Sequence, residues 1–311
     1  MLPARASVSM TNAMPTLAVI TRFTRPFTLL PPVVGIVSGS LVAYGATRQG
    51  WPWRAILLAA MAAGVLNAAS NGLNQICDLH IDRINKPQRP LPSGALSVRA
   101  AWLITLLGYG AALGLAACVN RQTLVIYTLA AAATFLYSAP PFRTKRSLWG
   151  ANLTIAATRG ELLKVAGWAA VSSVLGTWEP WIIGSVFFLF LLGATSTKDF
   201  ADMKGDAEDG CRTLPIVLGP VRAAWCIAPF FLLPWLLVLI AVARGWLRGN
   251  GTFLVGLALV LLVWGAWVGR LLVRDPQQLV TAGENHPAWR QMYLMMMASH
   301  LGMAAAYLVP R

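Results

Sequence analysis

Two short segments hold seven of the 11 acidic residues of this 311-residue chain, namely Asp78 and Asp82 in the first and Asp199, Asp202, Asp206, Glu208 and Asp209 in the second. The first carries Asn74, Asp78 and Asp82, which are spaced four residues apart. On a helix this spacing places the three side chains on one stripe, where the two carboxylates repel each other. A hard cation with oxygen ligands would relieve that repulsion, and Mg²⁺ is such a cation and commonly shares its shell with substrate phosphates. The segment therefore predicts a metal site that can also bind phosphate.

The second segment carries Asp199, Asp202 and Asp206, spaced i, i+3 and i+7, which again places three carboxylates on one helical face. Two such stripes facing each other would hold metal ions against a diphosphate. Either segment alone could be a solvated helix end, but the two together favour the metal site. We expect the five aspartates to be catalytic and, with Asn74, to ligate metal.

Basic residues and turn formers surround both acidic segments. Prolines and a glycine fix the loop that follows Asp82, and a Pro-Pro pair follows Tyr137. The predicted substrate-binding residues of these regions are Asn74, Arg83, Lys86, Arg89, Tyr137, Arg143, Lys145 and Lys198. Arg and Lys side chains bind phosphate oxygens through charge-assisted hydrogen bonds. The alternative role for each cation is to anchor the chain on the cytoplasmic side of a membrane.

The composition is that of a membrane protein. Hydrophobic residues make up 57% of the chain and charged residues 12%, and the mean hydropathy is +0.62. The formal net charge of +14 could suggest a nucleic-acid partner. We exclude nucleic acid because the basic residues fall in short gaps between long apolar runs, whereas a nucleic-acid binder gathers them on a water-facing surface.

The apolar runs predict an all-α, polytopic membrane protein with about nine spans, because a span needs about 20 mostly apolar residues. The predicted spans are Thr28–Ala46, Ala55–Leu73, Ala101–Val119, Leu124–Pro140, Asn152–Leu175, Pro180–Thr197, Ala223–Val242, Thr252–Val268 and Gln291–Leu308. No loop is long enough to form a second domain. We expect one transmembrane domain over residues 1–311, with residues 1–20 as a flexible N-terminal segment.

The basic residues are distributed unequally between the two sides of this topology. The side with the N-terminus carries 17 of the 25 Lys and Arg residues and the opposite side carries six. By the positive-inside rule, the N-terminus and both acidic segments are cytoplasmic. We expect a multi-pass protein of a bacterial cytoplasmic membrane.

The fifth predicted span is unusual because it contains Arg159, Glu161 and Lys164. Charged residues within a membrane are costly and commonly functional. One interpretation is an ion pair between Glu161 and Lys164, with Arg159 close enough to the cytoplasmic end to reach water. The other is that Arg159 or Lys164 points at the polar head of a substrate, and Arg159 could bind a carboxylate or phosphate there.

The stretches NQICDLHIDRINKPQRPLPSG (74–94), YSAPPFRTKR (137–146), KDFADMKGD (198–206) and RTLP (212–215) resemble the UbiA superfamily of intramembrane prenyltransferases. The resemblance extends over nearly the whole chain and implies nine helices around a central cavity. It also implies two Mg²⁺ ions that bridge an isoprenyl diphosphate donor, with Asn74, Asp78 and Asp82 in the first motif and Asp199, Asp202 and Asp206 in the second. Tyr137 and Lys145 resemble the family's diphosphate-contact loop.

Within the superfamily, the motifs are most similar to the homogentisate prenyltransferase, chlorophyll synthase and digeranylgeranylglyceryl phosphate synthase branches. The run from Thr158 to Leu163 resembles an Arg-Gly-x-Leu-Leu sequence of homogentisate-like enzymes, although Glu161 and Lys164 depart from it. This branch implies a lipophilic, aromatic acceptor. The leading hypothesis is an Mg²⁺-dependent prenyltransferase in the lipid bilayer. The alternatives are a UbiA-type membrane terpene cyclase and a cation- or proton-coupled transporter.

Overall fold

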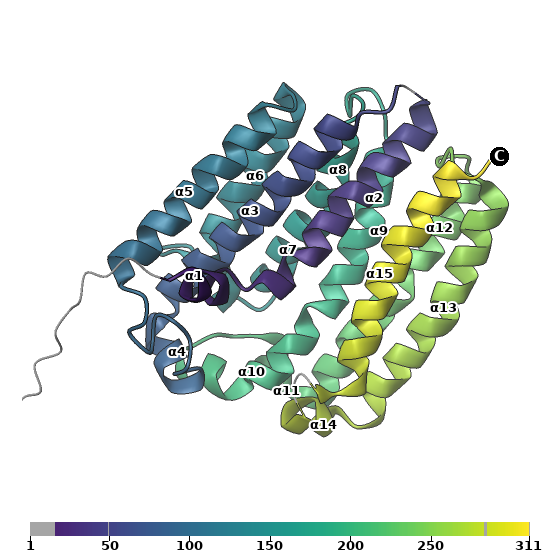
Figure 1. The fold of residues 1–311 in the computed structure, drawn as a ribbon. Coiled ribbons are helices and arrows are strands. Elements are labelled where there is room, and N and C mark those ends of the chain that lie inside the picture. The colour runs from purple at the N-terminus through teal and green to yellow at the C-terminus, as the bar shows by residue number, and fades with distance from the viewer. Residues whose placement is uncertain (1–15, 49, 283–284, 311) are drawn as a thin grey trace, which may run out of the picture.

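The protein is an all-helical bundle. The computed structural model describes residues 16–48, 50–282 and 285–310, and these residues form helices and loops without a β-strand. The longest helices lie side by side with a common tilt (Figure 1). The predicted all-α membrane fold is confirmed. Helix α1 begins at Leu17, inside the 1–20 segment for which we expected flexibility, while residues 1–15 lie outside the described part of the chain.

The helices fall into long members of the bundle and shorter pieces at its end. The α-helices are α1 (Leu17–Thr24), α2 (Leu30–Thr47), α3 (Trp53–Cys77), α4 (Leu79–Asn85), α5 (Val98–Ala117), α6 (Arg121–Ser138), α7 (Gly150–Ile155), α8 (Leu162–Ala169), α9 (Glu179–Ala194), α10 (Ser196–Glu208), α11 (Leu214–Ile227), α12 (Leu233–Ala243), α13 (Gly251–Arg274), α14 (Pro276–Ala282) and α15 (Pro287–Leu308). Short 3₁₀ turns cover Pro26–Thr28, Thr144–Arg146 and Ala228–Phe231, and a π-helix covers Ala156–Glu161.

Helical segments occupy all of the predicted spans. Six stretches of the described chain are long and apolar enough to cross a membrane, namely Pro26–Thr47, Trp53–Cys77, Val98–Ala117, Glu179–Glu208, Leu214–Ala243 and Gly251–Arg274. The other three predicted spans correspond to α6, to the interrupted helix from α7 to α8, and to α15. The count of nine membrane crossings stays a prediction.

Small residues let the central helices approach closely. Helix α2 packs against α3, α8 and α15, and α15 packs in turn against α13. A Cβ atom on Gly39 of α2 would lie 3.0 Å from the Lys164 carbonyl oxygen of α8, and one on Gly167 would lie 2.6 Å from the Ile36 carbonyl oxygen of α2. Such glycines allow close backbone packing in the absence of a hydrophobic driving force between membrane helices.

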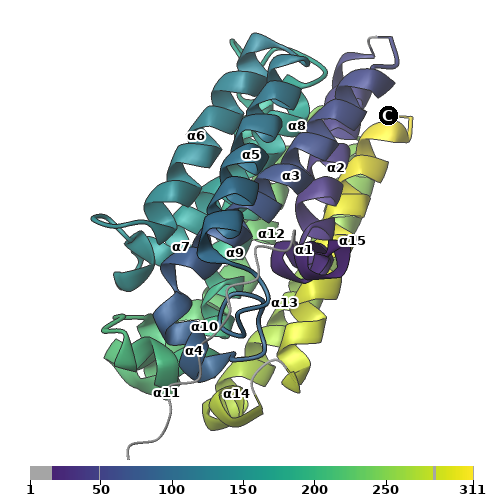
Figure 2. The same cartoon turned by 60° about the vertical axis from the view of Figure 1, so that its left-hand side comes forward.

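Helices α4, α10, α11 and α14 gather at one end of the bundle, at the bottom of both views (Figures 1 and 2). At the opposite end the buried Glu179 carboxylate binds Arg248 through the backbone N–H and Nε, both at 2.6 Å, and also accepts the Tyr307 hydroxyl. Both acidic segments lie at the end of the bundle that carries the short helices, because the first spans the junction of α3 and α4 and the second lies in α10.

The expected orientation can be tested with single cysteines at two exposed positions, Lys204 in α10 and Arg244 after α12. The exposed Cys118 and Cys226 are first replaced by Ala. An impermeant thiol reagent applied outside intact cells should label the Arg244→Cys protein and not the Lys204→Cys protein, because the basic residues are concentrated on the Lys204 side. Labelling of both proteins from the outside would contradict the topology.

Candidate active site

The two acidic segments line one pocket at the lower end of the bundle. The pocket contains about 690 Å³ of space, part of it open to solvent. Eleven of the predicted site residues line it: Asn74, Asp78, Asp82, Lys86, Arg89, Tyr137, Lys145, Lys198, Asp199, Asp202 and Asp206. Residues more than 100 positions apart in the chain thus meet in one space.

The first acidic segment departs from the predicted single helix. Helix α3 ends at Cys77 and α4 begins at Leu79, so Asp78 lies at the break, with φ −100° and ψ 11°. The Asn74 amide donates to Asp78 Oδ2 at 2.9 Å. The i to i+4 spacing therefore brings Asn74 and Asp78 together as expected, but the break redirects the turn that carries Asp82.

Three side chains hold the Asp78 carboxylate. Arg143 Nη2 lies 2.8 Å from Asp78 Oδ1, and Lys145 Nζ donates to the same oxygen. Burial is the largest single influence on the pKa of the Arg143 guanidinium and would lower it, but the hydrogen bond to Asp78 and the charges of Asp78 and Asp209 together outweigh burial and raise the pKa. Both cations come from the loop between α6 and α7. This loop therefore closes over the end of α3.

Two other acids of the pocket, Asp82 and Asp202, form ion pairs with the loop after α4. Arg89 Nη1 lies 2.6 Å from Asp82 Oδ2, and Lys86 Nζ lies 3.7 Å from Asp202 Oδ1. Lys198 also approaches Asp202, at 3.5 Å within α10. Burial, followed by the charge of Lys198, lowers the pKa of the Lys86 ammonium. The Lys86 pair connects the first acidic segment to the second.

Asp199 and Asp206 also line the pocket, without an ion pair to any part of the chain that the structure describes. No cluster of three or more His, Cys, Asp or Glu ligands is preformed among the described residues. A Mg²⁺ site does not need one, because this ion is usually bound through one or two carboxylates together with substrate phosphates and water. The pocket's donor set, carboxylate and amide oxygens, fits that requirement.

Sequence reasoning missed Arg25, which lines the same pocket. Arg25 adopts φ 55° between α1 and the following 3₁₀ turn. Three amides one turn apart on α3 hold this connection: Asn67 donates to Thr28, Asn71 to the Thr24 carbonyl and Thr28 hydroxyl, and Gln75 to the Phe23 carbonyl. The signal in the sequence was this row of amides at four-residue spacing, Asn67, Asn71 and Gln75, on one face of α3.

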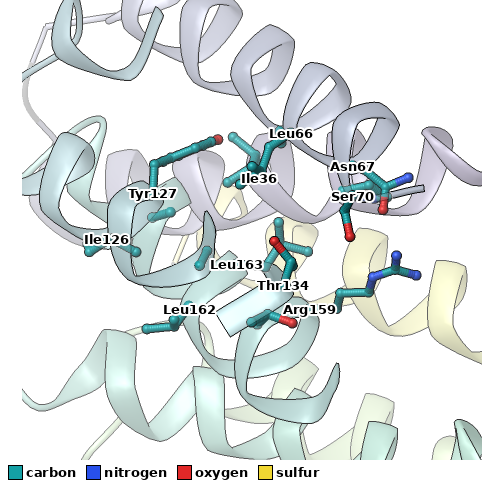
Figure 3. Close-up of a pocket in the computed structure, with 15 residues that line it drawn as sticks. Ile36, Leu66, Asn67, Ser70, Ile126, Tyr127, Thr134, Arg159, Leu162 and Leu163 are labelled. Carbon is teal, nitrogen blue, oxygen red and sulfur yellow. The ribbon is translucent and has the colours of Figure 1, made fainter. Parts of the chain in front are cut away.

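A second, mostly apolar cavity of about 480 Å³ lies one helical turn deeper in the bundle (Figure 3). Its polar end is formed by Asn67, Ser70, Thr134 and Arg159, and its opposite end by apolar side chains together with the ring of Tyr127. Ser70 of α3 and Thr134 of α6 precede Asn74 and Tyr137 of the acidic pocket by four and three residues. The two cavities therefore follow each other along the same helices.

The π-helix between α7 and α8 places Arg159 on this cavity. Gly160 packs so tightly on α9 that a Cβ atom there would lie 2.7 Å from the Phe188 nitrogen. Insertions of this type are frequent at functional sites. Arg159 is exposed and makes no hydrogen bond or ion pair with the described residues. Its guanidinium therefore keeps donors free for a ligand.

One sequence interpretation needs correction. Glu161 and Lys164 do not form an ion pair: Lys164 donates to Ser38 and lies 4.2 Å from the centre of the Phe187 ring, while the Glu161 carboxylate packs against Gly184 of α9. The π-helix changes the i to i+3 geometry and turns the two side chains to different neighbours. Arg83 is exposed on α4, and neither Arg83 nor Arg143 is among the residues that line the acidic pocket, so substrate binding by these two residues stays a prediction.

The sequence profile of the UbiA prenyltransferase family matches residues 29–282. The chain belongs to this family. The interval contains both acidic segments and the loop that carries Arg143 and Lys145. The UbiA resemblance seen in the motifs is confirmed, and the protein is a prenyltransferase.

Relatives of this UbiA protein occur in all three of the branches that its motifs resemble, including chlorophyll synthases. It is 33% identical over 211 residues to the digeranylgeranylglyceryl phosphate synthase of Thermococcus gammatolerans, covering 67% of this chain and 71% of the relative. It is 36% identical over 211 residues to a probable chloroplastic homogentisate phytyltransferase 2 of Oryza sativa subsp. japonica, covering 64% of this chain and 55% of the relative.

The fold is also similar to a solved structure. A UbiA homolog from Archaeoglobus fulgidus, bound to GPP and Mg²⁺, superposes with a TM-score of 0.68 at 20% identity. The match covers 94% of this chain and 100% of the homolog. At this level of identity the likeness shows that the two chains share the UbiA fold.

The close contact at Gly160 leads to a test of the packing between the π-helix and α9. Gly160→Ala should lower the free energy of unfolding by about 1–3 kcal/mol, because the added Cβ overpacks the contact with α9. Gly114→Ala in α5 is the matched control, since its Cβ would meet nothing within 4 Å and alanine favours the helix. Thermal unfolding in detergent measures the stability of the two variants. Equal unfolding midpoints for Gly160→Ala and Gly114→Ala would contradict the packing argument.

Proposed function

We propose that this UbiA protein transfers an isoprenyl group, in a Mg²⁺-dependent reaction, from a polyprenyl diphosphate to a lipophilic acceptor with an aromatic, anionic head. The observation that supports it most is that both acidic segments and five basic side chains line one pocket, Lys86, Arg89, Lys145, Lys198 and Arg25. Carboxylates can hold metal ions there, and the cations can hold phosphate oxygens. The apolar cavity that contains Arg159 lies next to this pocket, one helical turn deeper in the bundle.

The metal would be held by Asn74, Asp78 and Asp82 on one side of the pocket and by Asp199, Asp202 and Asp206 on the other. We propose two ions, one for each segment. A bound divalent cation stabilises negative charge that develops on the diphosphate leaving group. Among the chain's own residues, Lys86, Arg89 and Lys145 add positive charge at fixed positions, and such preorganised charge lowers the barrier to bond breaking.

The reaction breaks the allylic C–O bond, whose electron pair leaves on the diphosphate. A nucleophilic atom of the acceptor bonds to the allylic carbon, and the acceptor releases its proton to solvent. The cationic character of the allylic carbon requires exclusion of water. Tyr137 is the aromatic residue that lines the acidic pocket, and an aromatic face within about 6 Å can stabilise a cation.

Arg159 is the residue that we propose for the acceptor. It lies at the polar end of the apolar cavity, one helical turn from the acidic pocket. The planar guanidinium binds a carboxylate or phosphate through two hydrogen bonds. The apolar remainder of the cavity suits a ring or a chain. The relatives named for homogentisate and for glyceryl phosphate substrates support a head group of this class.

The other two hypotheses are not favoured. In a terpene cyclase the substrate's own double bonds capture the cation, so no acceptor site is needed, whereas Arg159 offers free donors beside the reacting centre. In a transporter the ion-binding acids generally lie near the middle of the membrane on broken helices. Here they lie at the end of the bundle, next to short helices and basic loops (Figure 2).

The proposal is tested with purified protein and a panel of geranyl, farnesyl and geranylgeranyl diphosphates, with and without Mg²⁺ and with homogentisate or a glyceryl phosphate lipid as acceptor. Asp78→Asn and Asp202→Asn should each lower kcat at least about 100-fold, because each removes a negative charge that would hold the metal ion against the diphosphate. The exposed Glu208→Gln is the control. Near-normal turnover of folded Asp78→Asn protein, or turnover in the absence of divalent cations, would contradict the proposal.

The acceptor site has a separate test. Arg159→Leu should raise the acceptor KM by about tenfold or more, because a hydrogen bond to a charged group contributes about 1.5–3 kcal/mol. Binding of the donor with Mg²⁺ should be unchanged. The exposed Arg244→Leu at the other end of the bundle is the matched control. An unchanged acceptor KM would show that the acceptor binds elsewhere.

A further inference from the structure

An acid outside the two motifs, Asp209, follows α10 and contacts the loop between α6 and α7. Asp209 Oδ1 lies 2.7 Å from Arg146 Nη2, and the backbone N–H of Arg212 donates to the Arg146 carbonyl at 2.9 Å. The chain therefore joins the end of the second acidic segment to the loop that carries Arg143 and Lys145.

Asp209 also shares Arg143 with the first acidic segment. The same nitrogen, Arg143 Nη2, lies 2.8 Å from Asp78 Oδ1 and 3.3 Å from Asp209 Oδ2. All three side chains are only 11 to 13% exposed, so their charges are weakly screened by solvent. The backbone of Arg143 has φ 41°, a left-handed conformation that is unfavourable for a non-glycine residue. Arg143 is thus held between two carboxylates on different elements.

This arrangement bears on how Asp78 can bind a metal ion. Asp78 Oδ1 accepts from Arg143 and from Lys145, so these two cations compete with any ion at that oxygen. Without another acceptor, Arg143 would lose its ion pair in a largely buried place, which is costly. Asp209 offers a second carboxylate to the same nitrogen, so Arg143 can give up Asp78 and remain paired.

We propose that Asp209 is a positioning residue that retains Arg143 at the rim of the pocket while Asp78 ligates the metal, and thereby raises the affinity of the site for the metal. This inference rests on the proposed function, because it requires a metal–diphosphate site at Asp78. The competing explanation is that Asp209 only fastens the loop to α10 through Arg146. The two explanations differ in which partner of Asp209 matters.

The experiment uses the full chain in detergent, with Mg²⁺ and inorganic diphosphate as the probe. The upward shift of the thermal unfolding midpoint is followed as Mg²⁺ is increased, which reports binding without turnover. Asp209→Asn should raise the half-saturating Mg²⁺ concentration about tenfold, as loss of a residue that orients a metal ligand typically does. Two control variants should leave the half-saturating Mg²⁺ concentration unchanged. Glu208→Gln alters the adjacent exposed acid, and Arg146→Gln removes only the ion pair between Arg146 and Asp209.

A double variant identifies the partner. When Arg143→Gln is already present, adding Asp209→Asn should cause no further change, because the two residues act through one contact. An unchanged Mg²⁺ response in Asp209→Asn, an equal effect of Arg146→Gln, or additive effects in the double variant would each overturn the inference. If Asp209→Asn does not fold, Asp209→Ser is measured in the same way. No Mg²⁺ response in the unaltered protein would instead refute the proposed function, and the inference with it.

Discussion

Repulsion among carboxylates that face one another at the end of an apolar bundle is the constraint on which the arrangement of this protein depends. Asp78, Asp82 and Asp202 each lie beside at least one Arg or Lys, and most of these cations come from loops distant in sequence. The ion pairs therefore do more than neutralise charge. They fix the loops after α4 and α6 over the ends of α3 and α10, so that the chemistry of the pocket and its closure depend on the same contacts.

A second requirement is that polar groups inside the bundle either have hydrogen-bond partners within the protein or bind a substrate. The α3 amides bind the backbone and hydroxyl groups of the connection that carries Arg25, and Lys164 is satisfied by a hydroxyl and an aromatic ring from neighbouring helices. Arg159 differs from both, because it faces a cavity without a hydrogen-bond partner among the described residues. A charged residue within an otherwise apolar helix of the bundle is commonly functional, which is why we assign Arg159 to substrate rather than to stability.

Local spacing predicted the parts of the site that are local in origin. Asp199, Asp202 and Asp206 share a face of α10, and Asn74 contacts Asp78, because periodicity alone decides both. The ion pairs between distant loops follow from packing and could not be predicted from spacing. The same limit explains the error at Glu161 and Lys164. Their spacing suggested a pair, but the π-helix and the close contact with α9 gave them other partners.

The central claim is that the two acidic segments jointly bind metal and diphosphate. The most direct measurement is an experimental structure of the protein with Mn²⁺, located by its anomalous scattering, and a thiolodiphosphate analogue of the donor. The account predicts ions ligated by carboxylates of both segments, one near Asp78 and one near Asp202, with the diphosphate between them and Lys145 on its oxygens. Ions or diphosphate bound elsewhere, with Asp78 still paired to Arg143 and Lys145, would contradict it.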